Sequence, residues 1–382
     1  MTATEEYTER EISLVPATDH SPTVRSLNVA DFAEIVGREE EWRFTPIKRL
    51  QGLTSEATNA TGQLNVSAQV VQGAEFSMGS NKDAQRAGFT DRVAAIAWSK
   101  VEEIATLRIA KSTQITEPVS VIIQGGGEVA FQQIDLVAEA FSKATVILDY
   151  RGAATVSSNV DIDVQDGAHL TVVSLQDWDT SAVHAGHHRI SLGRDAYVKH
   201  VSVTLGGDLV RILPSVTYQA PGGSAELLGL YFAGAGQHAE HRLFVDHAVP
   251  HCRSNVVYKG ALTGDDAHTV WVGDVLIRAN AIGTDTYEIN RNLVLSDGGR
   301  ADSVPNLEIE TGEIVGAGHA STTGRFDDEQ LFYLQSRGIS EEEARQLVLR
   351  GFFEELLGQI GVPEINERVR ERIESRIAES TK

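Results

Sequence analysis

The sequence predicts a mainly β protein with flanking helices, and a β-solenoid is the favoured arrangement of its strands. Between residues 106 and 318, short apolar runs are interrupted at roughly regular spacing by Gly, Asp or Asn. Within these runs apolar and polar residues alternate as they do in strands, so that Val201, Val203 and Leu205 share one face. No helical periodicity interrupts this region. A long series of short strands is therefore expected.

Turn residues favour a solenoid over the other all-β folds. Regular short strands also suit a sandwich, a barrel or a propeller, and the pattern alone leaves these alternatives open. However, Gly167, Gly193, Gly222 and Gly298 each precede a strand-like run. Small residues at such corners let stacked coils approach closely.

The N-terminal part is predicted to be a flexible tail over residues 1–25 and a mixed, partly helical region over residues 26–105. Residues 30–42 have helical character, and residues 90–107 form the stronger helix candidate. Thr90 is a suitable N-cap, and Val93, Ile96 and Val101 recur close to helical spacing. The β-solenoid core is assigned to residues 106–318.

Residues 319–382 are predicted to form a helical C-terminal region. Asp327 and Gln330 suit the start of a first helix, while Ser340 and Glu343 form a capping box for a second. Pro363 begins a third helix, which has a narrow apolar stripe. Such a stripe packs either on the protein's own neighbours or on another protein. Four apolar residues of the second helix are predicted to form a partner-docking surface: Phe352, Phe353, Leu356 and Leu357.

Composition excludes several classes of function. Asp and Glu number 54 against 33 Lys and Arg, a formal charge of −21, which disfavours binding to nucleic acid or anionic lipid. No apolar run reaches the roughly 20 residues of a membrane helix. The N-terminus lacks the basic and apolar segments of a signal peptide, so a cytoplasmic protein is expected. The single cysteine, Cys252, excludes an internal disulfide framework.

Two histidine groups are candidate metal sites. The first is HAGHH, with His184, His187 and His188, and the second comprises His238, His241, His247 and His251, followed by Cys252. Histidines on a strand alternate between its faces, so the second group cannot all converge. The first group is expected to form a polar surface where two strands meet at a turn. No nucleotide-binding or nucleophile-elbow motif is present, and Asp161 and Asp163 are predicted to be solvated carboxylates rather than a glycosidase site.

The most specific stretch of the sequence lies between residues 237 and 357. It contains PHCRSNVVYKGAL, then TDTYEINRNLVLSDGGRADSVPNLEIETGEIVGAGHASTTGR, and finally DEQLFYLQSRGISEEEA. This stretch resembles the SufB/SufD family, the paired scaffold proteins of the SUF iron–sulfur assembly system. WRFTPIKRL near the N-terminus also looks like SufD. The sequence is more similar to SufD than to SufB, since its N-terminal part has no obvious cysteine-bearing insertion.

The resemblance implies a right-handed parallel β-helix that pairs with SufB and docks the ATPase SufC through its C-terminal helices. It also implies that His319 faces a SufB cysteine where a transient iron–sulfur cluster forms. Relatives often carry a cysteine two residues earlier, where this sequence has Ala317. One thiol cannot hold a cluster by four cysteines, so the isolated chain is expected to bind no cofactor, and ATP is expected on SufC.

Two other functions stay open at this point. The chain could be a SufB-like homodimeric scaffold with its own cluster, and an isolated chain could also form a homodimer. The more remote alternative is a β-helix enzyme acting on carbohydrates, although only 6% of the residues are aromatic.

Overall fold

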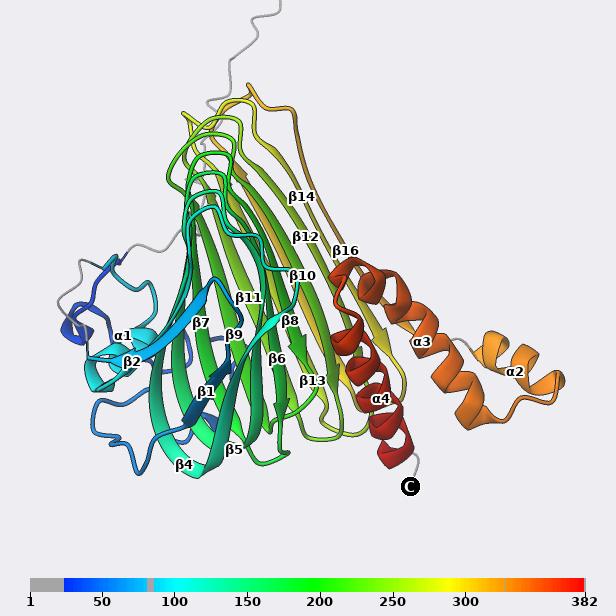
Figure 1. Ribbon diagram of the computed structural model, residues 1–382. Helices are drawn as coiled ribbons and strands as arrows, with labels where there is room; N and C mark the ends of the chain where they lie inside the picture. The colour runs from blue at the N-terminus through cyan, green and yellow to red at the C-terminus, as the bar shows by residue number, and fades with distance from the viewer. Residues whose placement is uncertain (1–23, 81–85, 327, 381–382) are drawn as a thin grey trace, which may run out of the picture.

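The computed structural model describes residues 24–80, 86–326 and 328–380, and it confirms the predicted solenoid. Parallel strands stack into about eight turns. Each later coil contributes one strand to each of two faces, so that the even-numbered strands form one face and the odd-numbered strands the other (Figure 1). Equivalent positions on successive coils are 27, 29 and 32 residues apart at Tyr197, Ser224, Arg253 and Asp285.

The first coils are built from two long strands, β4 (Val119–Ala138) and β5 (Lys143–Val164). Each passes through a corner and contributes to both faces. Three shorter strands pair at this end: β1 (Asn65–Gln69), β2 (Ala74–Gly79) and β3 (Ile104–Ile109). The remaining strands of the even face are β6 (His169–Trp178), β8 (Tyr197–Thr204), β10 (Ser224–Ala233), β12 (Arg253–Leu262), β14 (Asp285–Val294) and β16 (Gly316–Arg325). Those of the odd face are β7 (Val183–Leu192), β9 (Leu209–Tyr218), β11 (His238–His247), β13 (His268–Ile277) and β15 (Arg300–Ile309).

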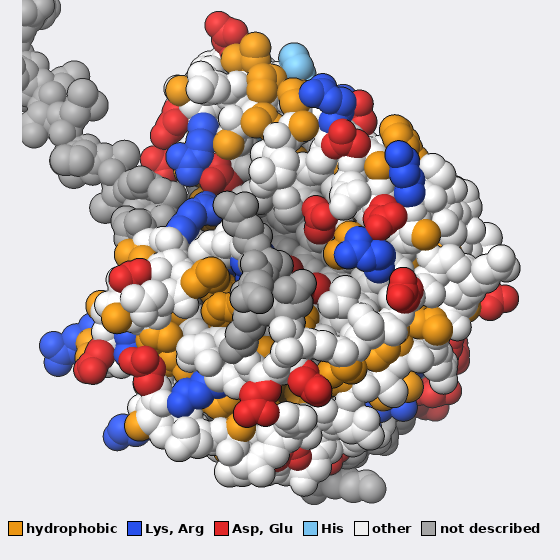
Figure 2. Space-filling model, turned by 60° about the vertical axis from the view of Figure 1, so that its left-hand side comes forward, with side chains coloured by type: hydrophobic (Ala, Val, Ile, Leu, Met, Phe, Trp, Pro, Cys, Tyr) orange, Lys and Arg blue, Asp and Glu red, His pale blue; other side chains and the backbone are white. Residues whose placement is uncertain are grey.

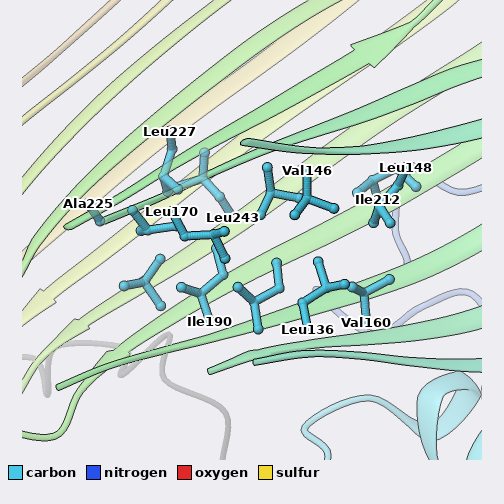
Figure 3. Close-up of a cluster of buried hydrophobic side chains, with 14 of the residues drawn as sticks. Leu136, Val146, Leu148, Val160, Leu170, Ile190, Ile212, Ala225, Leu227 and Leu243 are labelled. Carbon is cyan, nitrogen blue, oxygen red and sulfur yellow. The ribbon is translucent and has the colours of Figure 1, made fainter. Parts of the chain in front are cut away.

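Inward-facing apolar side chains of both faces form one continuous core. Figure 3 shows Val146, Leu170 and Leu227 from the even face beside Ile190 and Ile212 from the odd face. Burial of one such side chain contributes about 1.5–3 kcal/mol. The predicted corner glycines fit this arrangement, because Gly167, Gly222 and Gly298 adopt positive φ at turns where another residue would be strained.

The N-terminal region covers the outer surface of the odd face. It contains the 3₁₀ turns η1 (Val29–Asp31) and η2 (Ile47–Leu50) and the helix α1 (Arg92–Lys100). The predicted helix over residues 90–107 is thus shorter and is capped by Asp91, whose side chain accepts from two backbone N–H groups, rather than by Thr90. Residues 30–42 form no α-helix, and Gly37 has φ of 80° within that run. The predicted tail lies almost wholly outside the described residues.

The C-terminal helices cover the outer surface of the even face. They are α2 (Asp328–Ser336), α3 (Glu341–Ile360) and α4 (Pro363–Ser380), and α2 projects away from the solenoid (Figure 1). The capping box of Ser340 and Glu343 is confirmed. Asp327 lies outside the described residues. The predicted boundary between residues 318 and 319 is wrong, because β16 continues the solenoid to Arg325.

Acidic and basic side chains alternate over the surface seen in Figure 2, which includes the N-terminal side. Ion pairs also hold the N-terminal region to the odd face, including Arg86 with Asp135. In the part of the chain that the structure describes, no helix combines the length and the apolar character needed to cross a membrane.

Candidate functional site at the open end of the solenoid

The solenoid ends in an uncovered coil formed by β15 and β16. These two strands end the strand order, and among the residues that the structure describes each pairs only with the preceding strand of its face, β13 or β14, in parallel. Exposure changes sharply between the last two coils. Ile277 on β13 is fully buried, whereas its register partner Ile309 on β15 is 45% exposed. The interior of the last coil is therefore open on one side.

His319 lies on β16 at this open end. It is in register with Glu288 of β14, and its side chain is 43% exposed. The Nδ1 atom of His319 lies 3.9 Å from Oε1 of Glu288. Ala317, two residues earlier, packs against the edge of the apolar core. The predicted site residue is thus a partly exposed imidazole on the terminal coil.

Glu288 is an unusual interior residue that sequence reasoning missed. Its side chain is 1% exposed, and neither carboxylate oxygen has a hydrogen-bond partner. Burial, together with the like charge of Asp274, raises the pKa of Glu288 to about 8. A buried carboxyl group without hydrogen bonds is costly and marks a candidate functional site.

The missing side chain of Gly273 makes room for that carboxyl group. Gly273 lies on β13, and a Cβ atom there would overlap the Glu288 carboxylate and the ring of Trp271. The Glu288 side chain therefore reaches across the interior from the even face to the odd face.

A hydrogen-bonded polar chain fills the interior beside Glu288. Asn290 donates to the hydroxyl of Tyr231 at 2.9 Å, and Asn292 donates to Asn290 at 2.7 Å. Ser303 also donates to Asn290, and Ser321 donates to Ser303, each at 2.7 Å. The sequence TDTYEINRNLV shows the alternation that places these polar residues on one face, and the structure shows that this face is the buried one.

The three histidines of HAGHH are buried, as are His238, His241 and His247, so our interpretation of HAGHH as a polar surface is wrong; His251 alone of the two groups is exposed. His184 and His188 point into the solenoid, where His184 contacts Ser158 at 2.7 Å and His188 contacts His200 at 2.9 Å. Burial lowers the pKa of His184 to about 3, which keeps this imidazole neutral at neutral pH. Within the described residues, no three His, Cys, Asp or Glu side chains gather as metal ligands.

Cys252 and the aspartate pair do not form reactive centres. Cys252 is buried, and burial raises the pKa of its thiol, which disfavours the reactive thiolate. Asp161 accepts two hydrogen bonds from Arg189, at 2.7 and 2.6 Å. The Asp161 carboxylate is therefore held in an ion pair and is not free to act with Asp163 on a substrate.

The predicted docking residues are mostly inaccessible. Phe353, Leu356 and Leu357 are at most 1% exposed, because they pack on the outer surface of the even face. Phe352 is half-buried beside them, and its ring packs edge-to-face against the ring of Phe353. In this arrangement the three buried side chains hold α3 on the solenoid and offer no surface to another protein.

Exposed apolar side chains occur instead on α2 and on the outer side of α3. Phe332 is 74% exposed, Tyr333 is 55% exposed and Leu347 is 48% exposed. Large apolar side chains that are exposed side by side, as Phe332 and Tyr333 are in the chain, are typical of protein–protein contacts.

Residues 121–352 match a family described as the SufBD core domain of the SUF system for FeS cluster assembly. A SufBD family protein of Mycobacterium tuberculosis is 52% identical over 370 residues, which span 93% of each chain. The iron–sulfur cluster assembly protein SufD of Escherichia coli is 29% identical over 216 residues, covering 56% of this chain and 51% of SufD.

Two different family proteins of Mycobacterium bovis are similar to this chain. One is 52% identical and covers 93% of both chains. The other is 26% identical over 211 residues, which make up 55% of this chain and 25% of that protein. This chain is thus far more similar to one family protein of that organism than to the other.

Proposed function

Because this chain belongs to the SufBD family of SUF iron–sulfur cluster assembly proteins, we propose that it is a SufD-like scaffold subunit without catalytic activity of its own. It would pair with SufB through the open end of the solenoid. The observation that supports this most strongly is the terminal coil, whose inward-facing residues Ile309 and His319 are exposed where their counterparts one coil earlier are buried. A second solenoid stacked on this end would bury them.

Unpaired strand edges make such stacking favourable. β15 and β16 each carry backbone N–H and C=O groups on the side away from the preceding coil, and another chain can extend the sheet there by β-augmentation. The two family proteins of M. bovis are consistent with a pair of different subunits. We therefore favour a heterodimer over a homodimeric scaffold.

His319 is proposed to contribute one imidazole ligand to a transient cluster at this interface. Imidazoles ligate iron beside sulfur ligands in Rieske centres. This chain has one cysteine, and Cys252 is buried, so the thiolates would come from the partner. The cluster is cargo of the complex rather than a resident cofactor of this chain.

The ATPase SufC is proposed to dock on the C-terminal helices. The exposed residues Phe332, Tyr333 and Leu347 suit this contact better than the buried residues of α3. ATP would bind SufC, since this sequence has no nucleotide-binding motif.

The proposal is tested by co-expressing this chain with SufB and SufC and measuring the mass of the purified complex. One SufB, two SufC and one copy of this chain are expected. A lone chain that forms a stable homodimer with a stoichiometric cluster would favour the SufB-like alternative instead.

A variant separates assembly from chemistry. His319→Ala should leave the mass of the complex unchanged, because a 43% exposed side chain contributes little to folding, yet it should impair cluster maturation. Normal maturation in this variant would remove His319 from the mechanism.

A further inference from the structure

We propose that Glu288 and His319 together form a binding site for one divalent transition metal ion, with one carboxylate and one imidazole as its protein ligands. The inference rests on the proposed function, in which His319 meets iron, and it adds a second residue and a defined position. Ferrous iron is the ion that suits the proposed function, and carboxylate and imidazole are ligands that suit it.

The distance between the two residues fits a bridging ion. At 3.9 Å, Nδ1 of His319 and Oε1 of Glu288 are too far apart for a hydrogen bond. Bonds of divalent metals to imidazole nitrogen and carboxylate oxygen measure about 2.0–2.2 Å. An ion placed slightly off the line between these two atoms could therefore contact both without movement of the backbone.

The charges around Glu288 favour a cation. Both of its oxygens lack hydrogen-bond partners, whereas the neighbouring interior residues Asn290 and Asn292 are hydrogen-bonded. After burial, the like charge of Asp274 is the cause that raises the pKa of Glu288. A bound cation would offset the desolvation of the carboxylate and its repulsion from Asp274.

The architecture provides both space and access. Gly273 leaves room for the carboxylate on the opposite face, and the ring of Trp271 forms one wall. His319 is partly exposed, so an ion could enter through the open end of the solenoid. Water molecules or side chains of a partner would supply the remaining ligands, since within the described residues no third His, Cys, Asp or Glu side chain completes a group.

The test is an anaerobic titration of the full-length chain with Co²⁺, a spectroscopic probe, followed by competition with Fe²⁺. Wild-type protein should bind one equivalent with visible bands of nitrogen and oxygen ligands and without a thiolate charge-transfer band. Glu288→Gln, which preserves the shape of the side chain, should weaken binding at least about tenfold, as should His319→Ala. The double variant should bind Co²⁺ with about the same affinity as the single variant that binds it more weakly, because both residues belong to one site.

Control variants exclude a general effect of charge or of histidine. Glu308→Gln removes a carboxylate from the terminal coil, and His169→Ala removes an exposed imidazole elsewhere. Neither should change the titration. Far-ultraviolet circular dichroism of each variant should match that of the wild type.

The outcomes separate this inference from the proposed function. If His319→Ala abolishes binding and Glu288→Gln leaves it intact, the two-residue site is wrong while the role of His319 survives. If neither variant alters binding, both the site and the metal-binding role of His319 are wrong, although the mass of the complex could still support the scaffold function.

Discussion

Single residues in the solenoid interior are matched in size across neighbouring coils. Tyr231 of β10 is in register with Gly260 of β12, and Gly229 of β10 is in register with Tyr258 of β12. A Cβ atom at either glycine would overlap the tyrosine ring beside it. All four residues lie in the closely packed interior, where such rings leave no spare volume.

Replacement of Gly260 should therefore be costly. We expect Gly260→Ala to lower the free energy of unfolding by about 3 kcal/mol, at the upper end of the range for overpacked cores. In contrast, Gly351→Ala should raise it by about 0.5–1 kcal/mol, because Gly351 is exposed within α3 and an added Cβ atom would meet open space. Urea unfolding followed by circular dichroism measures both. Equal effects of the two substitutions would contradict the packing described here.

At the residue scale, the sequence predicted His319 through the family resemblance but did not predict Glu288. Alternation in TDTYEINRNLV places Glu288 and Asn290 on one face, but it does not tell which face is interior. A polar alternate row is ordinarily assigned to solvent. Only the stacking of coils shows that this row points inward. Gly273 leaves room for the Glu288 side chain, and this role also depends on a contact across the core.

Among the structural elements, the N-terminal region is held to the solenoid by a buried ion cluster around Glu240 of β11. Arg211 of β9 pairs with Glu240 at 3.3 Å and with Asp91 at 3.1 Å, and its guanidinium stacks on the ring of Trp42. Thr45 donates a hydrogen bond to Glu240 at 2.7 Å. Burial alone would raise the pKa of Glu240, but the hydrogen bond with His238 and the charge of Arg211 lower it to about 2.

This cluster predicts a pH-dependent effect of Glu240→Gln. The ordinary pKa of 4.5 applies to the unfolded chain, so the folded state favours the charged form. The stabilisation is complete above pH 4.5 and is lost as pH falls through the folded pKa of about 2. Glu240→Gln should cost about 3 kcal/mol at pH 7 and progressively less in acid. Urea midpoints at several pH values measure this, with the exposed Glu103→Gln as a control; a cost that grows in acid would contradict the assignment.

The helix α4 is attached to the even face by apolar contacts and by arginine. Arg368 pairs with Asp149 at 2.6 Å and with Asp177 at 2.8 Å, while Arg372 pairs with Asp177 at 2.7 Å. Burial alone would raise the pKa of Asp149, but hydrogen bonds from Arg151 and Arg368 hold it below its ordinary value. The two aspartates lie on β5 and β6, so α4 is tied to the early coils.

Loss of Arg368 should loosen α4 without unfolding the solenoid. In Arg368→Met, we expect faster amide hydrogen exchange in α4, because two partly buried carboxylates lose a partner, while exchange in β8 and β10 stays slow. Arg370→Met is the matched control, since Arg370 pairs with exposed Glu354 on the neighbouring helix. An equal effect of both variants on exchange would mean that the ion pairs to the solenoid do not hold α4.

The sequence predicted helices best where the local signals were strong. The capping box at Ser340 and the start at Pro363 locate α3 and α4 correctly. The helix at 90–107 was predicted too long because Ile104, which continued the helical spacing, belongs to β3, where the first two residues are both buried and hide the alternation of the strand. The docking residues show another limit, since an apolar helix face looks the same whether it packs on its own solenoid or on a partner.

Over the whole molecule, the sequence supported a solenoid without fixing its geometry. The spacing of equivalent positions varies from 27 to 32 residues between Tyr197 and Asp285, so no constant repeat is visible. Turns absorb these differences while the strands keep their register. The sequence also did not predict which helices cover which face, because the contacts of α1 and α3 with the strands join residues far apart in the chain.

The open end of the solenoid leads to a prediction about assembly. Ile309 and Val315 are 45% and 71% exposed on the terminal coil, and a partner that stacks there would bury both. Lysine at these positions stays solvated in the free chain but would be desolvated in the complex without a counter-charge. The double variant Ile309→Lys, Val315→Lys should therefore fold normally yet fail to co-purify with SufB.

The measurement is the mass of the co-expressed complex, and Val70→Lys, at a position 48% exposed beside β1, is the control. Because the C-terminal helices remain intact in the double variant, it should still retain SufC. Loss of SufC together with SufB would show that the two contacts are not independent. Retention of SufB would place the pairing surface away from the terminal coil.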